Sequence, residues 1–527
     1  MRIETAGRIQ GALVLLLLLW AVILHGLGFF SAGALWRDEA NSIQQARLPS
    51  WSSLWRSLDY DSFPALYPSA LRLWSGSSWR AGDEGLRVFG LLVGLALLAS
   101  VYFVARLLGN RRPVVVLVLL AANSVWISEG DSIRPYGLGL LLLLWTYGFM
   151  GACLARPSFL TLALATLGSV LCVQTIYTNA LWVGVFCLCA AGVSASRGEK
   201  WRSLRFFIPG ICAALSLLIY AGTLQRAREW AVILHYRVDW LQFIKGIAQS
   251  HSGLVPALWL GFLALAVRSV ARAIRTGASD SPRRAPVFCY LLSVFVLAAL
   301  VQILFVELAG VPPFPRYFLP PAAFAAFAIE AAFERSRPPL GALAVIAALA
   351  LTAWPSWSWM SMRHSNVDRV AGLLAGRAAP QDLIVVSPWF LNTSFQRYYR
   401  GPCPWITVPD LDRQPMMRYD LLKQAMLGRR PESGVARELR LALERGGAIW
   451  FVSQARWSNL ARAQAPETPR PPASPGGPDY ARFRSYWERD VEYRLNAGWV
   501  LSERHEPSRN VWDEENLILT RWSKKLP

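Results

Sequence analysis

Long apolar runs, separated by short polar segments, occupy the first two thirds of the chain. A hydrocarbon core of about 30 Å needs roughly 17–25 apolar residues in a helix. Runs near this length occur at residues 10–31, 86–105, 113–127, 136–154, 158–174, 180–194, 205–222, 253–270, 286–308, 317–333 and 340–359. The pattern predicts a polytopic α-helical membrane protein with about eleven transmembrane helices. The run 113–127 is short, so we expect it to be tilted or partly re-entrant.

The first run has a second possible interpretation, a cleaved signal peptide. Ala32-Gly33-Ala34 resembles a cleavage site. The apolar stretch before it is longer than the roughly 7–15 residues usual in a signal peptide. This length favours an anchor that is retained.

The pattern changes after residue 359, which divides the chain into a membrane domain, 1–359, and a second domain, 360–527. The second domain lacks long apolar runs and is expected to be a soluble α/β domain outside the cytoplasm. Its expected elements are buried strands at 382–387 and 449–453, amphipathic helices at 413–427 and 431–446, and a terminal hairpin of 498–503 with 515–520. Residues 465–478 form a proline-rich loop by composition.

The charge of the chain is informative through its distribution. The net charge is +20 and 54% of the residues are hydrophobic. Basic residues crowd alternate loops, for example 106–112, 197–205 and 268–284. The positive-inside rule makes these loops cytoplasmic, together with the N-terminus. The charge therefore does not indicate a nucleic-acid partner, and we expect a bacterial inner (plasma) membrane with the C-terminal domain in the periplasm.

The seven cysteines suggest neither a disulfide scaffold nor a zinc site. Six lie in or beside apolar runs, and none has the Cys-x-x-Cys or Cys/His spacing of a zinc ligand set. We expect them to be packing residues.

The first extracytoplasmic loop, 32–84, combines tryptophans with carboxylates. Trp36-Arg37-Asp38-Glu39-Ala40 follows the first apolar run, and the segments 51–59 and 67–74 suit short helices at the membrane interface. A carboxylate at the edge of a span is costly to desolvate, so it usually faces water or has a function.

Three further segments carry ionisable groups at span ends on the same predicted side. They are Asp59–Tyr67, Ser128–Tyr136 and Pro312–Pro320. Together with the first loop they offer carboxylates for proton transfer and guanidinium groups for an anion.

These segments resemble the motifs of the GT-C superfamily of membrane glycosyltransferases. The W-x-D-E-A element, followed by D-x-x-P-x-L-Y at 61–67, R-P-Y at 134–136 and P-R-Y-x-L-P at 315–320, is similar to the family 39 branch. That branch contains protein O-mannosyltransferases and the lipid A aminoarabinose transferase. The resemblance covers most of residues 10–335 and implies a GT-C fold. It also implies a polyprenyl-phosphate sugar donor and a glycolipid, polysaccharide or protein acceptor.

The resemblance also implies roles for individual residues. Asp38 matches the catalytic base, with Glu39 assisting. The expected donor-phosphate ligands are Arg134, Arg316, Tyr136 and Tyr317, and the expected acceptor or sugar ligands are Asp61, Asp131 and Tyr67. No cofactor is certain. Asp38, Glu39 and Asp131 could supply oxygen ligands to Mg²⁺ or Mn²⁺.

Each role has a simpler alternative. Asp38 could be the N-cap of a helix, Arg134 and Arg316 could be interfacial anchors, and Asp61 and Asp131 could be solvated loop charges. A membrane transporter or lipid flippase is the main alternative for the whole chain, and a non-catalytic scaffold is a third. The chain lacks the glycine-rich phosphate loops of nucleotide-binding enzymes. The expected partners are therefore the lipid-linked donor, the acceptor and membrane lipids.

Overall fold

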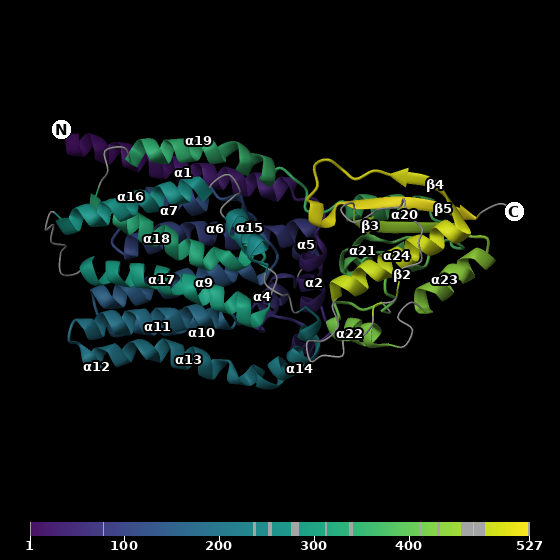
Figure 1. Ribbon diagram of the computed structural model, residues 1–527, viewed down its shortest axis with the longest axis horizontal. Coiled ribbons are helices and arrows are strands. Elements are labelled where there is room, and N and C mark those ends of the chain that lie inside the picture. The colour runs from purple at the N-terminus through teal and green to yellow at the C-terminus, as the bar shows by residue number, and fades with distance from the viewer. Residues whose placement is uncertain are drawn as a thin grey trace. The chain divides into compact units, whose positions relative to one another are not determined.

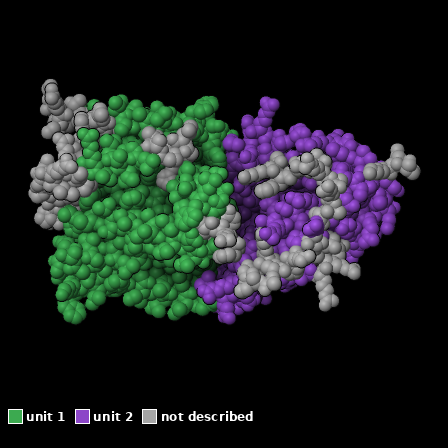
Figure 2. Space-filling model, viewed as in Figure 1, with its two compact units in different colours: residues 1–30, 63–221, 236–361 green, residues 31–62, 222–235, 362–527 purple. Residues whose placement is uncertain are grey.

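The structure is a computed structural model that forms two compact units. It describes residues 2–76, 78–234, 239–250, 256–275, 284–310, 313–336, 341–411, 413–428, 433–454, 467, 469 and 480–524. The first unit comprises residues 1–30, 63–221 and 236–361, and the second comprises 31–62, 222–235 and 362–527 (Figure 2). The second unit thus includes two segments that precede the C-terminal domain in the sequence.

The first unit is helical (Figure 1). Its elements are α1 Arg2–Ser31, α4 Leu66–Trp74, α5 Ser78–Ala81, α6 Asp83–Leu107, α7 Val114–Val116, the π-helix η2 Leu117–Ala121, α8 Ser124–Asp131, α9 Pro135–Ala155, α10 Phe159–Val173, α11 Asn179–Ser196, α12 Lys200–Ser203, η3 Leu204–Phe207, α13 Ile208–Ser216, η4 Leu218–Tyr220, α15 Trp240–Ser250, α16 Pro256–Arg275, α17 Arg284–Ala309, η6 Pro315–Phe318, α18 Leu319–Ser336 and α19 Gly341–Met360. Most residues of each predicted apolar run therefore lie in helix where the structure describes them, apart from short interruptions such as residues 122–123.

Fewer helices than predicted qualify as complete spans. In the described part of the chain, seven helices are long and apolar enough to cross a membrane, or up to eight if the bent pair α7–η2 and α8 is one span. The expected eleven included runs such as α10 and α16, whose apolar stretches are shorter than a full span. The chain is nevertheless a multi-pass membrane protein.

The run 113–127, which we expected to be tilted or partly re-entrant because it is short, is bent. Val114–Ala121 and Ser124–Asp131 meet at an angle of 68°. The Asn123 side chain accepts the backbone N–H groups of Val125 and Trp126 and so caps the second half. At the start of the first half, one Glu330 oxygen accepts the N–H groups of Val115 and Val116 at 2.7 and 2.9 Å. Polar side chains thus accept early N–H groups of both halves, which lack a partner within their own helix.

Helix α9 is central to the first unit. It packs against α6, α10, α11 and α17. Its Tyr147 ring lies 5.2–5.6 Å from the rings of Phe186, Tyr290, Phe324 and Phe327. Aromatic side chains from three further helices therefore converge on one position of α9.

The second unit is an α/β domain to which part of the first loop belongs (Figure 1). Its elements are α2 Arg37–Ala46, α3 Trp51–Ser57, η1 Leu58–Tyr60, most of α14 Ala221–Ala231, η5 Val232–Leu234, α20 Val367–Arg377, β1 Leu383–Val386, η7 Trp389–Leu391, α21 Asn392–Tyr398, β2 Trp405–Thr407, α22 Tyr419–Leu427, α23 Ser433–Glu444, β3 Ile449–Gln454, α24 Tyr480–Gly498, β4 Trp499–His505, η8 Asp513–Glu515 and β5 Leu517–Lys524.

The five strands form one sheet in the order β2-β1-β3-β5-β4. The strands β2, β1 and β3 are parallel, and β5 continues antiparallel to β3 and β4. Every residue of β1 and β3 is buried, which is why both strands appear as apolar runs in the sequence. The predicted strands and the terminal hairpin are confirmed.

The helices of this unit differ more from the prediction. The helix expected at 413–427 begins only at Tyr419, and α20, α21 and α24 were not predicted. The proline-rich loop 465–478 lies outside the described residues except for positions 467 and 469. All seven cysteines are described and free of disulfides.

Candidate functional site

Asp38 and Glu39 lie in the first turn of α2. The helix begins at Arg37 with Trp36 as its N-cap residue, so Asp38 is not the N-cap that the simpler alternative required. Carboxylates in this turn are favoured by the partial positive charge of the helix N-terminus. The Asp38 side chain is 17% exposed, and its Oδ1 lies 3.8 Å from Nε of Arg37. Asp38 is therefore partly accessible.

Glu39 is fully buried and has structural contacts. Its Oε2 accepts the Trp36 N–H at 3.4 Å and lies 3.7 Å from Nδ1 of His364. The His364 ring stacks on Trp512 with 4.0 Å between centroids. Because Glu39 closes the start of its own helix, Asp38 is the better candidate for contact with a substrate.

Residues of the C-terminal segment, 362–527, form hydrogen bonds with α2 and with the residues just before it. The Tyr398 hydroxyl accepts the Leu35 N–H at 2.7 Å, and Asn41 Oδ1 accepts the Met417 N–H at 2.8 Å. Gln44 donates to the Thr393 carbonyl at 2.9 Å. These bonds explain why α2 belongs to the second unit although it is close in sequence to α1.

Asp61 has a local role in the structure. It follows η1, and its Oδ1 accepts the backbone N–H of Ser62 at 2.6 Å. Asp59, which the sequence analysis did not select, pairs with Arg226 at 2.7 Å and accepts the indole N–H of Trp230 through its carbonyl at 2.9 Å. Asp59 therefore anchors the segment around Arg226 and Trp230. Its proximity to Asp61 in the sequence was the available signal.

Arg134 and Arg316 share an aromatic partner in the first unit. Arg134 is the N-cap residue of α9, and Arg316 lies in η6. Their guanidinium carbons lie 5.8 and 5.3 Å from the centre of the Tyr136 ring. The structure thus brings together two cations from segments about 180 residues apart.

Further aromatic rings complete this cluster. Arg134 also lies over Phe63 at 5.0 Å, and Arg316 lies over Phe314 at 4.4 Å and Tyr317 at 5.7 Å. A guanidinium held by its face against a ring can still present N–H groups along its edge. All four predicted phosphate ligands therefore belong to one cationic and aromatic cluster.

Asp131 has a partner that sequence reasoning missed. Its Oδ1 lies 2.6 Å from Nδ1 of His25, which is 2% exposed. Gly94 on α6 makes room for this pair, since a Cβ there would lie 1.7 Å from Asp131 Oδ1. Tyr67, the remaining predicted ligand, is 2% exposed and packs against Phe89 with 6.1 Å between ring centres.

Metal binding has no preformed cluster in the described part of the chain. No group of three or more His, Cys, Asp or Glu side chains among these residues is arranged to hold an ion. The idea that Asp38, Glu39 and Asp131 bind Mg²⁺ or Mn²⁺ stays a prediction.

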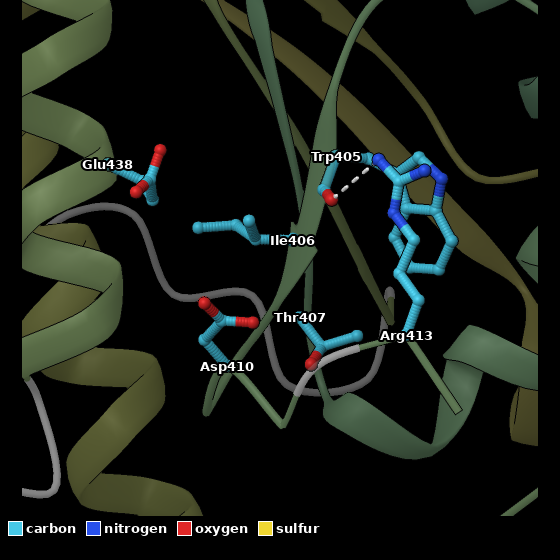
Figure 3. A pocket seen from close by; sticks show the side chains of 6 residues that line it. All are labelled: Trp405, Ile406, Thr407, Asp410, Arg413 and Glu438. Atoms are coloured by element: carbon cyan, nitrogen blue, oxygen red, sulfur yellow. Dashed lines mark hydrogen bonds between the residues drawn. The ribbon is translucent and has the colours of Figure 1, made fainter.

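A polar pocket lies in the second unit, and none of the predicted site residues lines it. It has a volume of about 230 Å³ and is lined by Trp405, Ile406, Thr407, Asp410, Arg413 and Glu438 (Figure 3). The Arg413 guanidinium lies 4.9 Å from the centre of the Trp405 ring and donates to the Trp405 carbonyl. The carboxylates of Asp410 and Glu438 lie on the opposite side of Ile406 (Figure 3).

Solved structures identify the fold. The crystal structure of ArnT from Cupriavidus metallidurans, bound to undecaprenyl phosphate, matches with a TM-score of 0.52 and 13% identity, over 83% of this chain and 92% of that one. The chain has the GT-C fold. No protein-family model and no curated protein sequence matches it.

Two other solved structures are less similar. The oligosaccharyltransferase of Archaeoglobus fulgidus matches with a TM-score of 0.44 and 13% identity, over 84% of this chain and 69% of that one. The mycobacterial arabinofuranosyltransferase AftD matches with a TM-score of 0.40 and 16% identity, over 97% of this chain and 42% of that one. The fold assignment does not depend on either.

Proposed function

We propose that this protein is a GT-C glycosyltransferase that moves a sugar from a polyprenyl-phosphate donor to an extracytoplasmic acceptor. The observation that carries the proposal is the gathering of Arg134 and Arg316 around Tyr136. Two guanidinium groups are suited to one phosphate, because each offers a planar fork of donors. The ArnT structure of the same fold contains undecaprenyl phosphate, a ligand of this chemical class.

The two arginines would act on the leaving group. When the bond between the anomeric carbon and the phosphate oxygen breaks, negative charge grows on the phosphate. Preorganised cations stabilise that charge without having to reorganise. Tyr136 and Tyr317 would hydrogen-bond the same phosphate, and Asp131 and Tyr67 would hold sugar or acceptor hydroxyls.

Asp38 would be the general base. It takes the proton from an acceptor hydroxyl while that oxygen bonds to the anomeric carbon and the lipid phosphate departs. A base of this kind typically contributes about 10²–10⁴-fold to the rate. The structure supports Asp38 over Glu39 because Asp38 is partly exposed whereas Glu39 is buried and caps α2.

The arrangement favours transfer over transport. Arg134 precedes α9 and Arg316 precedes α18, so both cations lie at helix ends. Transporters place their substrate-binding groups near the middle of the bilayer, often in repeated halves. We propose a bacterial inner-membrane enzyme with a cytoplasmic N-terminus and a periplasmic C-terminal domain. The acceptor is a glycolipid, polysaccharide or protein.

The test compares wild type, Asp38→Asn and Glu84→Gln in nanodiscs. Each protein receives a panel of radiolabelled undecaprenyl-phosphate sugars with a bacterial membrane extract as the acceptor. Glu84 is a matched control, since it is the second residue of α6 as Asp38 is of α2. We expect transfer by wild type and Glu84→Gln, and a loss of about 10²-fold or more in Asp38→Asn. Equal transfer by Asp38→Asn would exclude Asp38 as the base.

A further inference from the structure

The last turn of the C-terminal segment contacts the first residue of α2. The η8 turn places Glu515 so that its Oε2 accepts the backbone N–H of Arg37 at 2.7 Å, while its Oε1 accepts the Ser394 hydroxyl. Glu515 is completely buried. All of these residues belong to the second unit, although 478 positions separate Arg37 and Glu515.

This contact satisfies a group that the helix cannot satisfy itself. The first N–H groups of an α-helix lack partners within it, and a carboxyl oxygen can accept them. Glu39 takes the N–H of Trp36, and Glu515 takes the next one along the chain. Two acidic side chains from distant parts of the sequence, Glu39 and Glu515, therefore accept the N–H groups where α2 starts.

Arg37 is also held through its carbonyl and its side chain. The Thr393 hydroxyl donates to the Arg37 carbonyl at 2.9 Å. The guanidinium donates to the Glu514 carbonyl at 3.0 Å and lies 4.6 Å from the centre of the Phe390 ring. Residues of the C-terminal segment thus hold the backbone N–H, the carbonyl and the guanidinium of the residue directly before Asp38.

We propose that Glu515 is a positioning residue for the reaction, which fixes the Asp38 carboxylate by holding the Arg37 N–H. The proposal rests on the proposed function, because it gives Asp38 the role of base. Its physical basis is that a base must lie within hydrogen-bond reach of the proton it removes. A misplacement of about 1 Å can cost about 10²-fold in rate. Ser394 supports Glu515 from the opposite oxygen.

Two substitutions at Glu515 separate positioning from other effects. Glu515→Gln can accept the Arg37 N–H through its amide oxygen and donate its amide group to Ser394, whose hydroxyl already lies 3.2 Å from the Leu391 carbonyl. Glu515→Ala removes both contacts. Ser394→Ala removes one contact and leaves the bond to Arg37. Glu506→Ala is the control, since Glu506 is in the same unit and largely exposed.

The variants are tested as full-length protein in nanodiscs, with the undecaprenyl-phosphate sugar that wild type uses. For Glu515→Ala we expect kcat to fall about 10–100-fold while the donor KM changes less than about twofold. Glu515→Gln should stay within about threefold of wild type. Hydrogen exchange of residues 37–40 should accelerate in Glu515→Ala but not in Glu515→Gln, because only alanine removes the acceptor of the Arg37 N–H.

Several results would overturn the proposal. Wild-type kcat in Glu515→Ala, beside an inactive Asp38→Asn, would refute the positioning role and leave the proposed function intact. A loss in Glu515→Gln as large as in Glu515→Ala would show that charge, not position, matters. A fall in kcat that only matches the loss of folded protein would also count against it. An active Asp38→Asn would instead refute the proposed base.

Discussion

His25 Nδ1 lies 2.6 Å from Asp131 Oδ1, although the two residues are 106 positions apart. His25 is in α1 and Asp131 is the last residue of α8, so the pair joins two helices of the first unit. Buried ionisable groups in membrane helices are rare and usually pair with one another. The pair gives α8 a fixed end three residues before Arg134.

Breaking this pair should destabilise the first unit. Removing one member of a buried pair leaves the other unsatisfied and typically costs about 3–5 kcal/mol. We expect His25→Ala and Asp131→Ala each to lower the free energy of unfolding in detergent titrations. The double variant should lose clearly less than the sum of the two. Additive losses would mean that the two side chains do not interact.

Gly94 should not tolerate alanine. A Cβ at this position would lie 1.7 Å from Asp131 Oδ1 and 3.1 Å from the His25 ring. Gly94→Ala should therefore shift α6 or break the pair and lower the unfolding temperature by several degrees. Gly184→Ala in α11 is the matched control, because no atom lies within 4 Å of its added Cβ. A similar unfolding temperature for both variants would contradict the close approach.

Glu330 should be replaceable by glutamine but not by alanine. One of its oxygens accepts the N–H groups of both Val115 and Val116. The amide oxygen of Glu330→Gln can do the same, whereas Glu330→Ala leaves two buried N–H groups without this acceptor, at a cost of about 1–3 kcal/mol each. Unfolding in detergent measures the difference. Equal stability of the alanine and glutamine variants would contradict this role.

Glu515 should make stability depend on pH. Burial raises the pKa of its carboxyl from the ordinary 4.5 to about 8, against the lowering effects of Arg37 and Ser394. The folded state thus keeps a proton that the unfolded chain releases above pH 4.5. The contribution of the Glu515 carboxyl to the free energy of unfolding is fully present below pH 4.5 and is lost as the pH rises through 8.

The measurement is the unfolding temperature of wild type and Glu515→Gln between pH 5 and 9. Each unit of pKa shift corresponds to about 1.4 kcal/mol, so the change should be on the order of a few kcal/mol. In the glutamine variant this part of the fall in stability should be absent. The unfolding temperature of the variant relative to wild type should therefore rise as the pH rises. Parallel curves for the two proteins would show that Glu515 does not titrate in this range. Glu492, whose pKa burial raises to about 7, contributes equally to both curves.

Arg316→Lys should weaken use of the donor although it conserves the charge. Lysine offers a point charge instead of a planar fork and loses stacking on Tyr136 and Phe314. We expect kcat/KM for the lipid-linked donor to fall about 10-fold, as for one lost charge-assisted hydrogen bond. Arg134→Lys should behave in the same way. Unchanged donor kinetics in both variants would argue against phosphate binding by the cluster.

The sequence predicted those features that depend on local pattern. Apolar runs located the helices, and the shortness of the run 113–127 led us to expect a tilted or partly re-entrant segment, which is bent in the structure. The buried strands β1 and β3 stood out because they are apolar on both faces. The motifs R-P-Y and P-R-Y identified the arginines that meet at Tyr136. In each case the physical cause lies within about ten residues of the feature.

Features that depend on distant partners could not be predicted in this way. His25 is a single polar residue in an apolar run, and its partner follows 106 positions later. The hydrogen bond from the Arg37 N–H to Glu515 is not signalled by any local sequence pattern around either residue. Helix α24 was missed because its 19 residues are rich in charged and aromatic side chains, so no apolar periodicity stands out.

The division of the chain into interleaved segments limits how the enzyme can be re-engineered. Residues 31–62 and 222–235 fold with residues 362–527, so the chain passes between the two units repeatedly. A chimaera that exchanged only the region after residue 361 would keep an α2 whose partners Tyr398, Met417 and Glu515 came from another protein. A transplant with a chance of retaining the geometry around Asp38 must carry all three segments together.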